Sequence, residues 1–548
     1  MRLSFVRKLL VAAVAATVTL SASTASAQKI TLPNGGTVTG TLESSVNGDK
    51  IQVFRGIPYA EPPVGDRRWR HATLKPLAGN LTATAYGNVC YGDGSVDAQS
   101  WLFPNSEDCL FLNVFAPAGV TATSKLPVMV WIHGGGFVSG ASNWFDGSNL
   151  VAASGNKIVY VSINYRLSVF GFLAGDALKG EGKGVNFGLT DQEMAFQWVK
   201  ENIAHFGGNA NDVTIFGESA GAKSVGTHLI SRDGNPQLFQ KAIAESGTFT
   251  TAHDIPSKDK QNAAFSQILS KVGCDTRTTD AERLSCLRAA DVSAIWAAGG
   301  KLGWQPSVDG VFIKESPIRR MLDGKVSPMP TLLGTNTNEG YGFTATITTE
   351  AQLVPWLRAR FSLLTDAEIT RLLELYPAAN FANTNYRAGE IYGDVQYVCP
   401  SSLNSVVQAK AGRTAYRYRF NEPGPSPFPP SSTLVNHTAE LNYVFNNVSV
   451  LAKDDGTQGL VKNVQRYWTN FAITGSPNGQ PRQDSCGDAG ADGAFQWPLF
   501  DAASRQQIVL QANNLKVEKL GAYMPLNEER CAFWYDVEVR LAPTLAVI

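Results

Sequence analysis

A serine flanked by glycines follows an apolar run of this chain and restricts the folds that the chain can adopt. Residues 213–216 (Val-Thr-Ile-Phe) form a predicted strand, which passes directly into Gly217-Glu218-Ser219-Ala220-Gly221. Such a serine, at a tight strand-to-helix turn with a strained backbone, is the pattern of a nucleophile elbow. The glycines relieve crowding in the turn because they carry no β-carbon. The pattern therefore predicts an α/β architecture with the Ser219 hydroxyl presented at the top of a sheet.

A second glycine run supports this interpretation. A chain with 51 glycines can produce the elbow pattern by chance, so an ordinary turn is the alternative. His133-Gly134-Gly135-Gly136, however, follows directly after the predicted strand at residues 128–132. Its backbone can point two N–H groups at one developing oxyanion, with the Ala220 N–H as a third donor. The alternative for this run is a flexible glycine-rich turn.

Elimination identifies the general base. With this elbow the expected chain order is serine, acid, histidine, and only His228, His253 and His437 follow Ser219. His228 falls in the helix behind the elbow, and His253 leaves little chain for an acid before it, so His437 remains. Glu339 lies in a polar loop after a predicted strand and is the favoured acid. The residues alone leave other carboxylates between the serine and the histidine open.

Apolar, β-branched runs alternate with helical patterns along the chain. Residues 191–206 place apolar side chains at steps of three and four, which predicts an amphipathic helix. A strand on either side of it implies a parallel pair with a crossover helix, whereas the early strands have shorter links and are expected to be antiparallel. The predicted class is a large α/β protein with a mixed sheet. The expected strands cover residues 51–54, 110–115, 128–132, 158–163, 213–216, 331–333, 415–420 and 508–510.

The N-terminus carries an export pattern. Three basic residues among the first eight precede an apolar stretch at residues 9–20, and Ala25-Ser26-Ala27 follow. This arrangement is typical of a secretory signal peptide at residues 1–27, and the apolar stretch is too short to span a bilayer. An uncleaved anchor is the alternative. The chain is expected to be secreted or periplasmic, and no later apolar run predicts a membrane span.

Composition and length limit the partners and the domain count. The chain has 47 basic and 47 acidic residues, so removing the three basic residues of the leader leaves 44 against 47, a net charge of −3. This balance argues against a nucleic-acid partner. Length alone suggests about three domains, but the chemistry-bearing residues from Gly134 to His437 must converge on one site. Residues 28–548 are therefore expected to form a single catalytic domain.

The cysteines predict disulfides rather than a metal site. No pair has zinc-ligand spacing, and export favours disulfides. Short loops favour Cys90–Cys109 and Cys274–Cys286, although sequence alone does not fix the pairing. Cys486 lies in a polar, turn-rich stretch and is the expected unpaired thiol. No metal or cofactor is expected.

Further motifs extend the pattern along most of the chain. Together they resemble the type-B carboxylesterase family, which includes cholinesterases and some fungal lipases. One departure is Phe111, where the family pattern has a tyrosine; it affects packing. The matching stretches are Phe206-Gly207-Gly208 before the elbow, Glu107 to Val114, Phe54 to Ala60 with Pro62-Pro63, Asn164-Tyr165-Arg166 with Phe170-Gly171-Phe172, Asn338-Glu339-Gly340, His437-Thr438-Ala439-Glu440 and Cys531-Ala532-Phe533-Trp534.

The resemblance implies an α/β-hydrolase fold, with a large, mostly parallel mixed sheet flanked by helices. It implies Ser219 as nucleophile, His437 as general base and acid, and Glu339 as the partner of the histidine. It also implies a third disulfide, Cys399–Cys531. Oxyanion-hole donors would be Gly135, Gly136 and Ala220, while Glu218 and Ser246 resemble residues that support the histidine.

The function implied is a secreted serine esterase that acts on small-molecule esters through an acyl-enzyme. More specialised alternatives are a lipase, a feruloyl esterase or a cholinesterase-like enzyme, and a non-catalytic, cholinesterase-like binding protein is the alternative from another class. The loop between Cys90 and Cys109 is short, which favours soluble esters over interfacial lipid. Trp101 and Phe137 are candidates for the substrate pocket, although Trp101 fits a packing role better.

Overall fold

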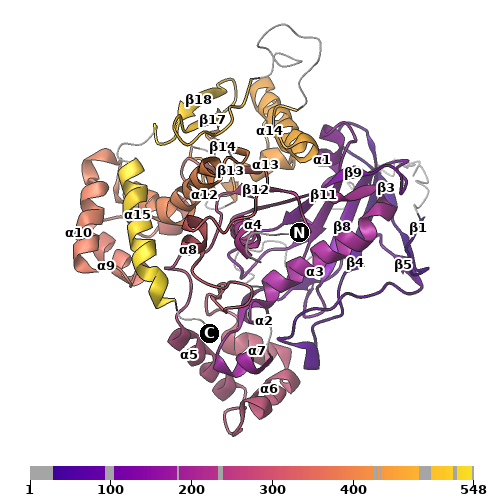
Figure 1. The fold of residues 1–548 in the computed structure, drawn as a ribbon, viewed down its shortest axis with the longest axis horizontal. Helices are drawn as coiled ribbons and strands as arrows, with labels where there is room; N and C mark the ends of the chain where they lie inside the picture. The colour runs from indigo at the N-terminus through magenta and orange to yellow at the C-terminus, as the bar shows by residue number, and fades with distance from the viewer. Residues whose placement is uncertain are drawn as a thin grey trace, which may run out of the picture.

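Eleven strands form the central sheet of the computed structural model (Figure 1). Across the sheet they are β18 (Lys516–Lys519), β17 (Gln506–Leu510), β14 (Ala415–Phe420), β13 (Thr331–Asn336), β12 (Lys241–Glu245), β11 (Gly208–Glu218), β9 (Leu126–Ile132), β10 (Val159–Ile163), β8 (Phe111–Pro117), β4 (Lys50–Pro58) and β3 (Thr41–Ser44). The structure describes residues 29–92, 104–181, 184–231, 238–424, 426–427, 430–431, 433–479, 495–522 and 527–545. The predicted signal peptide at residues 1–27, Trp101 and Cys486 lie outside these ranges.

The sheet is mixed and mostly parallel, as predicted. From β10 to β17 each strand runs parallel to its neighbour, whereas β10–β8, β8–β4, β4–β3 and β17–β18 pair antiparallel. The two strands expected to form a pair around the crossover helix, β10 and β11, are parallel but not adjacent, because β9 lies between them. One central strand, β12, was not predicted.

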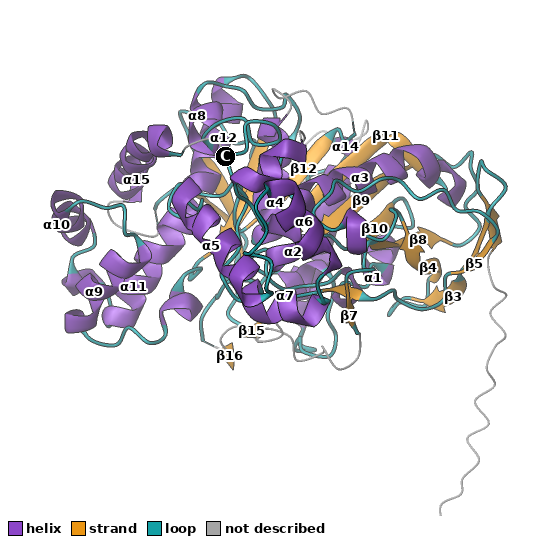
Figure 2. Ribbon diagram, turned by 90° about the horizontal axis from the view of Figure 1, so that it is seen from below, coloured by secondary structure: helices purple, strands orange, loops and turns teal. Residues whose placement is uncertain are grey.

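Helices cover both faces of the sheet (Figure 2). In β11 successive side chains alternate, so that Val213 and Ile215 enter one core and Phe216 the other. The first core packs against α3 (Phe187–Asn202) and α4 (Ala220–Ile230), and the second against α1 (Ser148–Ala153), α13 (Leu441–Val444) and α14 (Asp455–Thr474). Helix α3 continues into a 3-10 turn, Ile203–Phe206, and this pair of elements corresponds to the amphipathic helix predicted at residues 191–206.

A group of helices forms a lobe at one end of the sheet (Figures 1 and 2). Its core is a separate cluster that includes Leu357, Leu372 and Trp534. The elements of this lobe are α9 (Glu350–Arg360), α10 (Asp366–Leu375), α11 (Thr384–Gly393), a π-helix (Asp394–Val398), the start of α12 (Cys399–Lys410) and α15 (Asn527–Leu541). The remaining α-helices are α2 (Ser168–Phe172), α5 (Lys258–Lys271), α6 (Asp280–Ala289), α7 (Val292–Gly299) and α8 (Pro317–Leu322).

Short strands lie outside the central sheet. β1 (Lys29–Thr31), β2 (Thr37–Thr39) and β5 (Asn80–Thr82) form a three-stranded sheet. β6 (Val89–Cys90) pairs with β7 (Asn105–Ser106), and β15 (Ser426–Pro427) pairs with β16 (Pro430–Ser431). In the part of the chain that the structure describes, no helix has the length and apolar character needed to cross a membrane.

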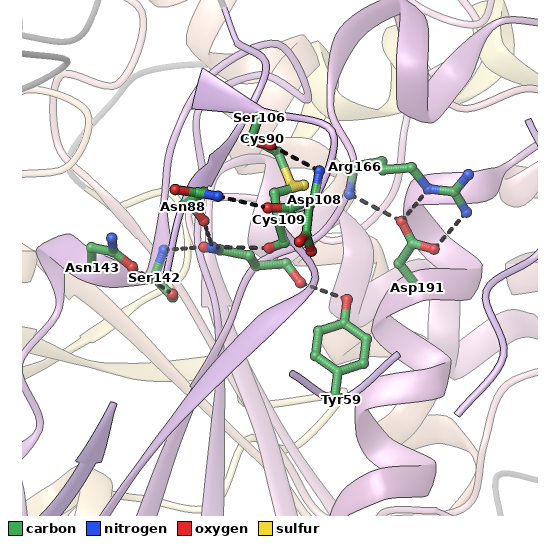
Figure 3. The surroundings of a disulfide bond; sticks show 11 residues. Tyr59, Asn88, Cys90, Ser106, Asp108, Cys109, Ser142, Asn143, Arg166 and Asp191 are labelled. Carbon is green, nitrogen blue, oxygen red and sulfur yellow. Dashed lines mark hydrogen bonds and ion pairs between the residues drawn. A yellow bond between two sulfur atoms is a disulfide. The ribbon is translucent and has the colours of Figure 1, made fainter. Parts of the chain in front are cut away.

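Three disulfides link segments of the fold: Cys90–Cys109, Cys274–Cys286 and Cys399–Cys531. Figure 3 shows Tyr59, Asn88 and Cys109 around the first of them. Asn164 Nδ2 donates hydrogen bonds to the backbone carbonyls of Asn88 and Cys109, and the backbone carbonyl of Asn164 accepts from the Tyr59 hydroxyl. These bonds attach the base of the disulfide loop to the end of β10. The third disulfide joins the first residue of α12 to α15.

Candidate active site

The turn after β11 has the strained geometry of a nucleophile elbow. Ser219 sits at φ 56° and ψ −119°, in a left-handed region that side chains rarely adopt, and α4 begins at the next residue. A β-carbon added at Gly217 would lie 2.6 Å from the carbonyl oxygen of Ile132, and one at Gly221 only 2.0 Å from it. Both positions therefore require glycine because the elbow packs against the end of β9.

The glycine run after β9 lies against this elbow. A β-carbon added at Gly134 would be 3.1 Å from the β-carbon of Ser219. Gly135 and Gly136 have φ values of 105° and 64°, and the Gly135 carbonyl accepts backbone hydrogen bonds from the next turn. The run therefore folds back beside the serine, in the place where an oxyanion loop is needed.

His133 at the start of this run is structural. Its ring stacks on Tyr165 at a centroid distance of 4.4 Å, and the Tyr165 hydroxyl donates to the His133 carbonyl. Burial lowers the pKa of His133 to about 4, so the ring is neutral at pH 7. The histidine thus fixes the base of the glycine run without adding a charge near the elbow.

The structure brings Glu339 and His437 together. Glu339 Oε2 lies 2.7 Å from His437 Nδ1, and Glu339 Oε1 accepts a 2.6 Å hydrogen bond from the Asn336 backbone N–H at the end of β13. The two loops are joined by a bridge in which the Asn338 N–H donates to the Val435 carbonyl. A carboxylate at Nδ1 favours the tautomer with its proton on that nitrogen, which leaves Nε2 available as a base.

Nε2 of His437 faces the elbow. Glu218 Oε1 lies 3.1 Å away from it, and Glu218 is the residue immediately before Ser219. In the described part of the chain, no hydrogen bond joins the Ser219 hydroxyl to Nε2. The contact with Glu218 brings Nε2 next to the residue that precedes Ser219, and hydrogen bonds of active sites are often long or incomplete until substrate binds.

Further buried carboxyl groups lie close to Glu218 and Glu339. Burial, then the charges of its carboxylate neighbours, raises the pKa of Glu218 well above its usual value, and burial likewise raises that of Glu245. Burial and the charge of Glu339 raise the pKa of Glu440 to about 8. Ser246 Oγ donates to Glu440 Oε1 at 3.2 Å, so this serine reaches the histidine only indirectly.

Glu440 and Tyr397 lie at the site but were not predicted as site residues. Glu440 lies three residues after His437 in the stretch His437-Thr438-Ala439-Glu440, and that spacing was the available signal for it. Tyr397, whose ring stacks on His437 at 4.4 Å, comes from the π-helix of the lobe, and no motif indicated it. Asn336 joins the two carboxyl groups, because its backbone N–H binds Glu339 and its side chain donates to Glu440.

Phe137, His228 and His253 are packed in the interior of the protein. Phe137 is fully buried and packs edge-on against Phe172 behind the glycine run, where it has no exposed surface for a ligand. His228 contacts Gln192 in the core, and His253 packs between aromatic rings of the lobe. Neither of these histidines has a contact with Glu339 among the described residues.

The family model, the similar sequences and the similar structure all indicate one family of ester hydrolases. The model of the carboxylesterase family matches residues 26–534. "Secreted lipase 4" of Gibberella zeae is 32% identical, with 92% of each chain aligned, and the acetylcholinesterase of Danio rerio is 32% identical, over 91% of this chain and 86% of its own. The crystal structure of Aspergillus niger EstA has a TM-score of 0.81 at 27% identity, covering 94% of this chain and 99% of EstA.

Proposed function

The chain belongs to the carboxylesterase family and is a carboxylic-ester hydrolase, and from that premise we propose that it is a secreted serine esterase with a Ser219–His437–Glu339 triad. The observation that carries the triad is the 2.7 Å contact between Glu339 Oε2 and His437 Nδ1, with Nε2 facing the elbow. The three groups come from loops after parallel strands, where the carboxyl ends of the strands gather such residues.

The proposed reaction proceeds in two halves. Ser219 Oγ attacks the ester carbonyl while His437 Nε2 takes its proton, and the tetrahedral oxyanion is stabilised by the backbone N–H groups of Gly135, Gly136 and Ala220. The intermediate collapses, and the imidazolium gives its proton to the leaving alcohol. Water then attacks the acyl-enzyme by the same steps, which releases the acid and restores the serine.

Glu339 contributes through the charge and orientation of His437. As an acceptor of two N–H donors, it suits the ionised form of a carboxylate, and it stabilises the imidazolium that forms during each half-reaction. Burial raises the pKa of Glu218 well above its usual value, and burial and the charge of Glu339 raise the pKa of Glu440 to about 8. Glu440 is therefore mainly protonated at pH 7.

Secretion is supported by three independent features. The leader at residues 1–27 has the order of charges, apolar residues and small residues of a signal peptide. Three disulfides suit an oxidising compartment, and a relative is named a secreted lipase. Expression of the full chain with N-terminal sequencing of the exported product tests this proposal; a mature N-terminus at Gln28 is expected, and retention in the cytoplasm would contradict it.

The triad is tested with a soluble short-chain aryl ester and an organophosphate label. Ser219→Ala is expected to lose turnover and labelling, and His437→Gln to lower both by orders of magnitude. Ser44→Ala, at an exposed serine of β3, is the matched control and should keep wild-type rates. Wild-type turnover by Ser219→Ala would rule out the triad.

The substrate class proposed is a soluble ester, in line with the short loop between Cys90 and Cys109. A panel of aryl esters with acyl chains from two to twelve carbons, compared with an emulsified triglyceride, separates an esterase from a lipase. Preference for the short, dissolved esters is expected. A rate that rises sharply at the oil–water interface would instead favour the lipase alternative.

A further inference from the structure

The imidazole of His437 has an aromatic contact on one ring face as well as contacts at both nitrogens. The ring of Tyr397 lies 4.4 Å from it, centroid to centroid, at an interplanar angle of 29°. Glu339 contacts Nδ1 and Glu218 contacts Nε2. Contacts at the two nitrogens restrict their direction, whereas a stacked ring opposes tilting of the imidazole out of its own plane.

A local irregularity of the chain places Tyr397 there. Asp394–Val398 forms a π-helix between α11 and α12, and Pro400 is the second residue of α12. Proline has no N–H to bond the carbonyl of the residue four positions earlier, and its ring clashes with that carbonyl, so the helix widens before it. A π-turn contains an extra residue, which rotates the following side chains by about 100° relative to a regular α-helix.

A buried lysine connects this π-helix to the helix of the nucleophile. Lys223 lies one turn after Ser219 in α4, and its Nζ donates to Gln396 Oε1 at 2.8 Å and contacts Asp254 Oδ2 at 3.2 Å. The same ammonium lies 5.8 Å from the centre of the Tyr397 ring. Lys223 therefore fixes the residue next to Tyr397 as well as approaching the tyrosine itself.

Asp254 balances the charge of Lys223. Asp254 also accepts a 2.6 Å hydrogen bond from Arg360 at the end of α9. Burial alone would raise the pKa of Asp254, but Lys223 and Arg360 lower it to about 2, so the carboxylate is charged across the working range. The ion pairs join α4 to the lobe. Removing one partner of a buried ion pair destabilises the fold strongly, because the other charge is left buried and uncompensated.

We propose that Tyr397 is a positioning residue for His437 and that Lys223 positions Tyr397. The inference rests on the proposed function, since it concerns the base of that reaction. When His437 becomes an imidazolium, the face of the tyrosine ring attracts the cation, and the stack holds Nε2 toward the serine. The charged and titratable groups around His437 are Glu339 and Glu218 at its nitrogens, Tyr397 on its face, Glu440 behind Asn336, and Lys223 behind Tyr397.

The first test compares Tyr397→Leu with Tyr397→Phe on the aryl ester. The leucine variant is expected to lower kcat about 10- to 100-fold while KM changes less than about threefold, because misplacement of a catalytic group by about 1 Å has effects of this size. The acid limb of its kcat/KM profile should move to lower pH, since the imidazolium loses a stabilising face. The phenylalanine variant keeps the ring and should remain within about threefold of the wild type on both counts.

The second test measures coupling to the lysine. Lys223→Met should lower kcat in the same direction, and the Lys223→Met/Tyr397→Leu double variant should be little worse than Tyr397→Leu alone, because both act on one element. Lys179→Met removes an exposed lysine as a matched control and should leave kcat unchanged. Additive losses in the double variant would overturn the role of Lys223.

Failure of the inference can be distinguished from failure of the proposed function. Wild-type kcat and pH profile in Tyr397→Leu, with Ser219→Ala inactive, would overturn the positioning role and leave the triad standing. Turnover by Ser219→Ala would instead overturn the proposed function. Circular dichroism and the thermal midpoint verify folding, and if the leucine variant does not fold, Tyr397→Met provides the same comparison with a longer side chain.

Discussion

Replacing Glu440 with glutamine should change how stability depends on pH. Glu440 is fully buried, its Oε1 accepts from Ser246 and its Oε2 accepts from the Asn336 side chain. Glutamine has nearly the same shape: its oxygen can accept from Asn336, and its amide can donate to the Ser246 hydroxyl, which both donates and accepts. The substitution therefore removes a titrating group with little change in packing.

The magnitude follows from the pKa of Glu440, which burial and the charge of Glu339 raise from 4.5 to about 8. Between these values the folded chain keeps a proton that the unfolded chain has released. The resulting stability is complete below about pH 4.5 and is lost as pH rises through 8, at about 1.4 kcal/mol per pH unit. Between pH 5.5 and 7.5 the wild type should lose about 2.7 kcal/mol relative to Glu440→Gln, or about 2–3 °C in thermal midpoint for a chain of this length.

The assay is the thermal midpoint of both proteins at pH 5.5, 6.5 and 7.5, followed by circular dichroism at one scan rate. The difference between the two midpoints should shift steadily in favour of the variant as pH rises. Glu374→Gln, at an exposed carboxyl group of α10, is the control and should run parallel to the wild type. A constant difference between Glu440→Gln and the wild type would refute the conclusion that Glu440 binds a proton on folding.

Three further predictions concern the elbow, the acid and a disulfide. Gly221→Ala places a β-carbon against a strand carbonyl and should destabilise the fold by at least about 3 kcal/mol, whereas Gly459→Ala, in an uncrowded part of α14, should stabilise it by about 0.5–1 kcal/mol in denaturant melts. Glu339→Gln should lower kcat about 10³- to 10⁴-fold at unchanged folding, as steady-state kinetics would show. Replacing both cysteines of Cys399–Cys531 with serine opens a loop of 132 residues and should reduce the free energy of unfolding by about 3–5 kcal/mol in chemical denaturation.

The parts of the site that sequence predicted are those encoded by local backbone demands. The elbow needs glycine at Gly217 and Gly221 because of contacts made within a few residues and with one strand end. The glycine run needs positive φ at Gly135 and Gly136, which is again a local property. Elimination among few histidines supplied His437, because chain order in this architecture is restrictive.

The strand that was missed shows the limit of apolar patterns. β12 reads Lys-Ala-Ile-Ala-Glu and has a single β-branched residue, yet all five residues are buried. Its charged ends are tolerated because Lys241 forms an ion pair with Asp212 and Glu245 accepts from the Trp468 indole N–H at 2.8 Å. Those partners come from other segments of the chain, and no short window of sequence reveals them.

The order of β9, β10 and β11 in the sheet and the stacking of Tyr397 on His437 could not be predicted from the sequence, for the same reason. β9 lies between β10 and β11 although it precedes both in the chain, so the pairing depends on the whole sheet. Tyr397 reaches His437 only after the π-helix and the lobe are in place. Motifs identify groups that react, whereas the side chains that hold them are chosen by tertiary packing.

The way the lobe is closed has a consequence for the order of assembly during synthesis. Its core combines helices near residues 350–399 with α15, which begins at Asn527. This core is therefore incomplete until α15 has been synthesised. The central strands from β8 to β13 can pair well before that point, because they need only segments already made. A nascent chain would therefore carry the elbow, the glycine run and Glu339 before Tyr397 is fixed beside His437. Hydrolytic competence would then arise late, as one of the final events of folding rather than as a property of the early sheet.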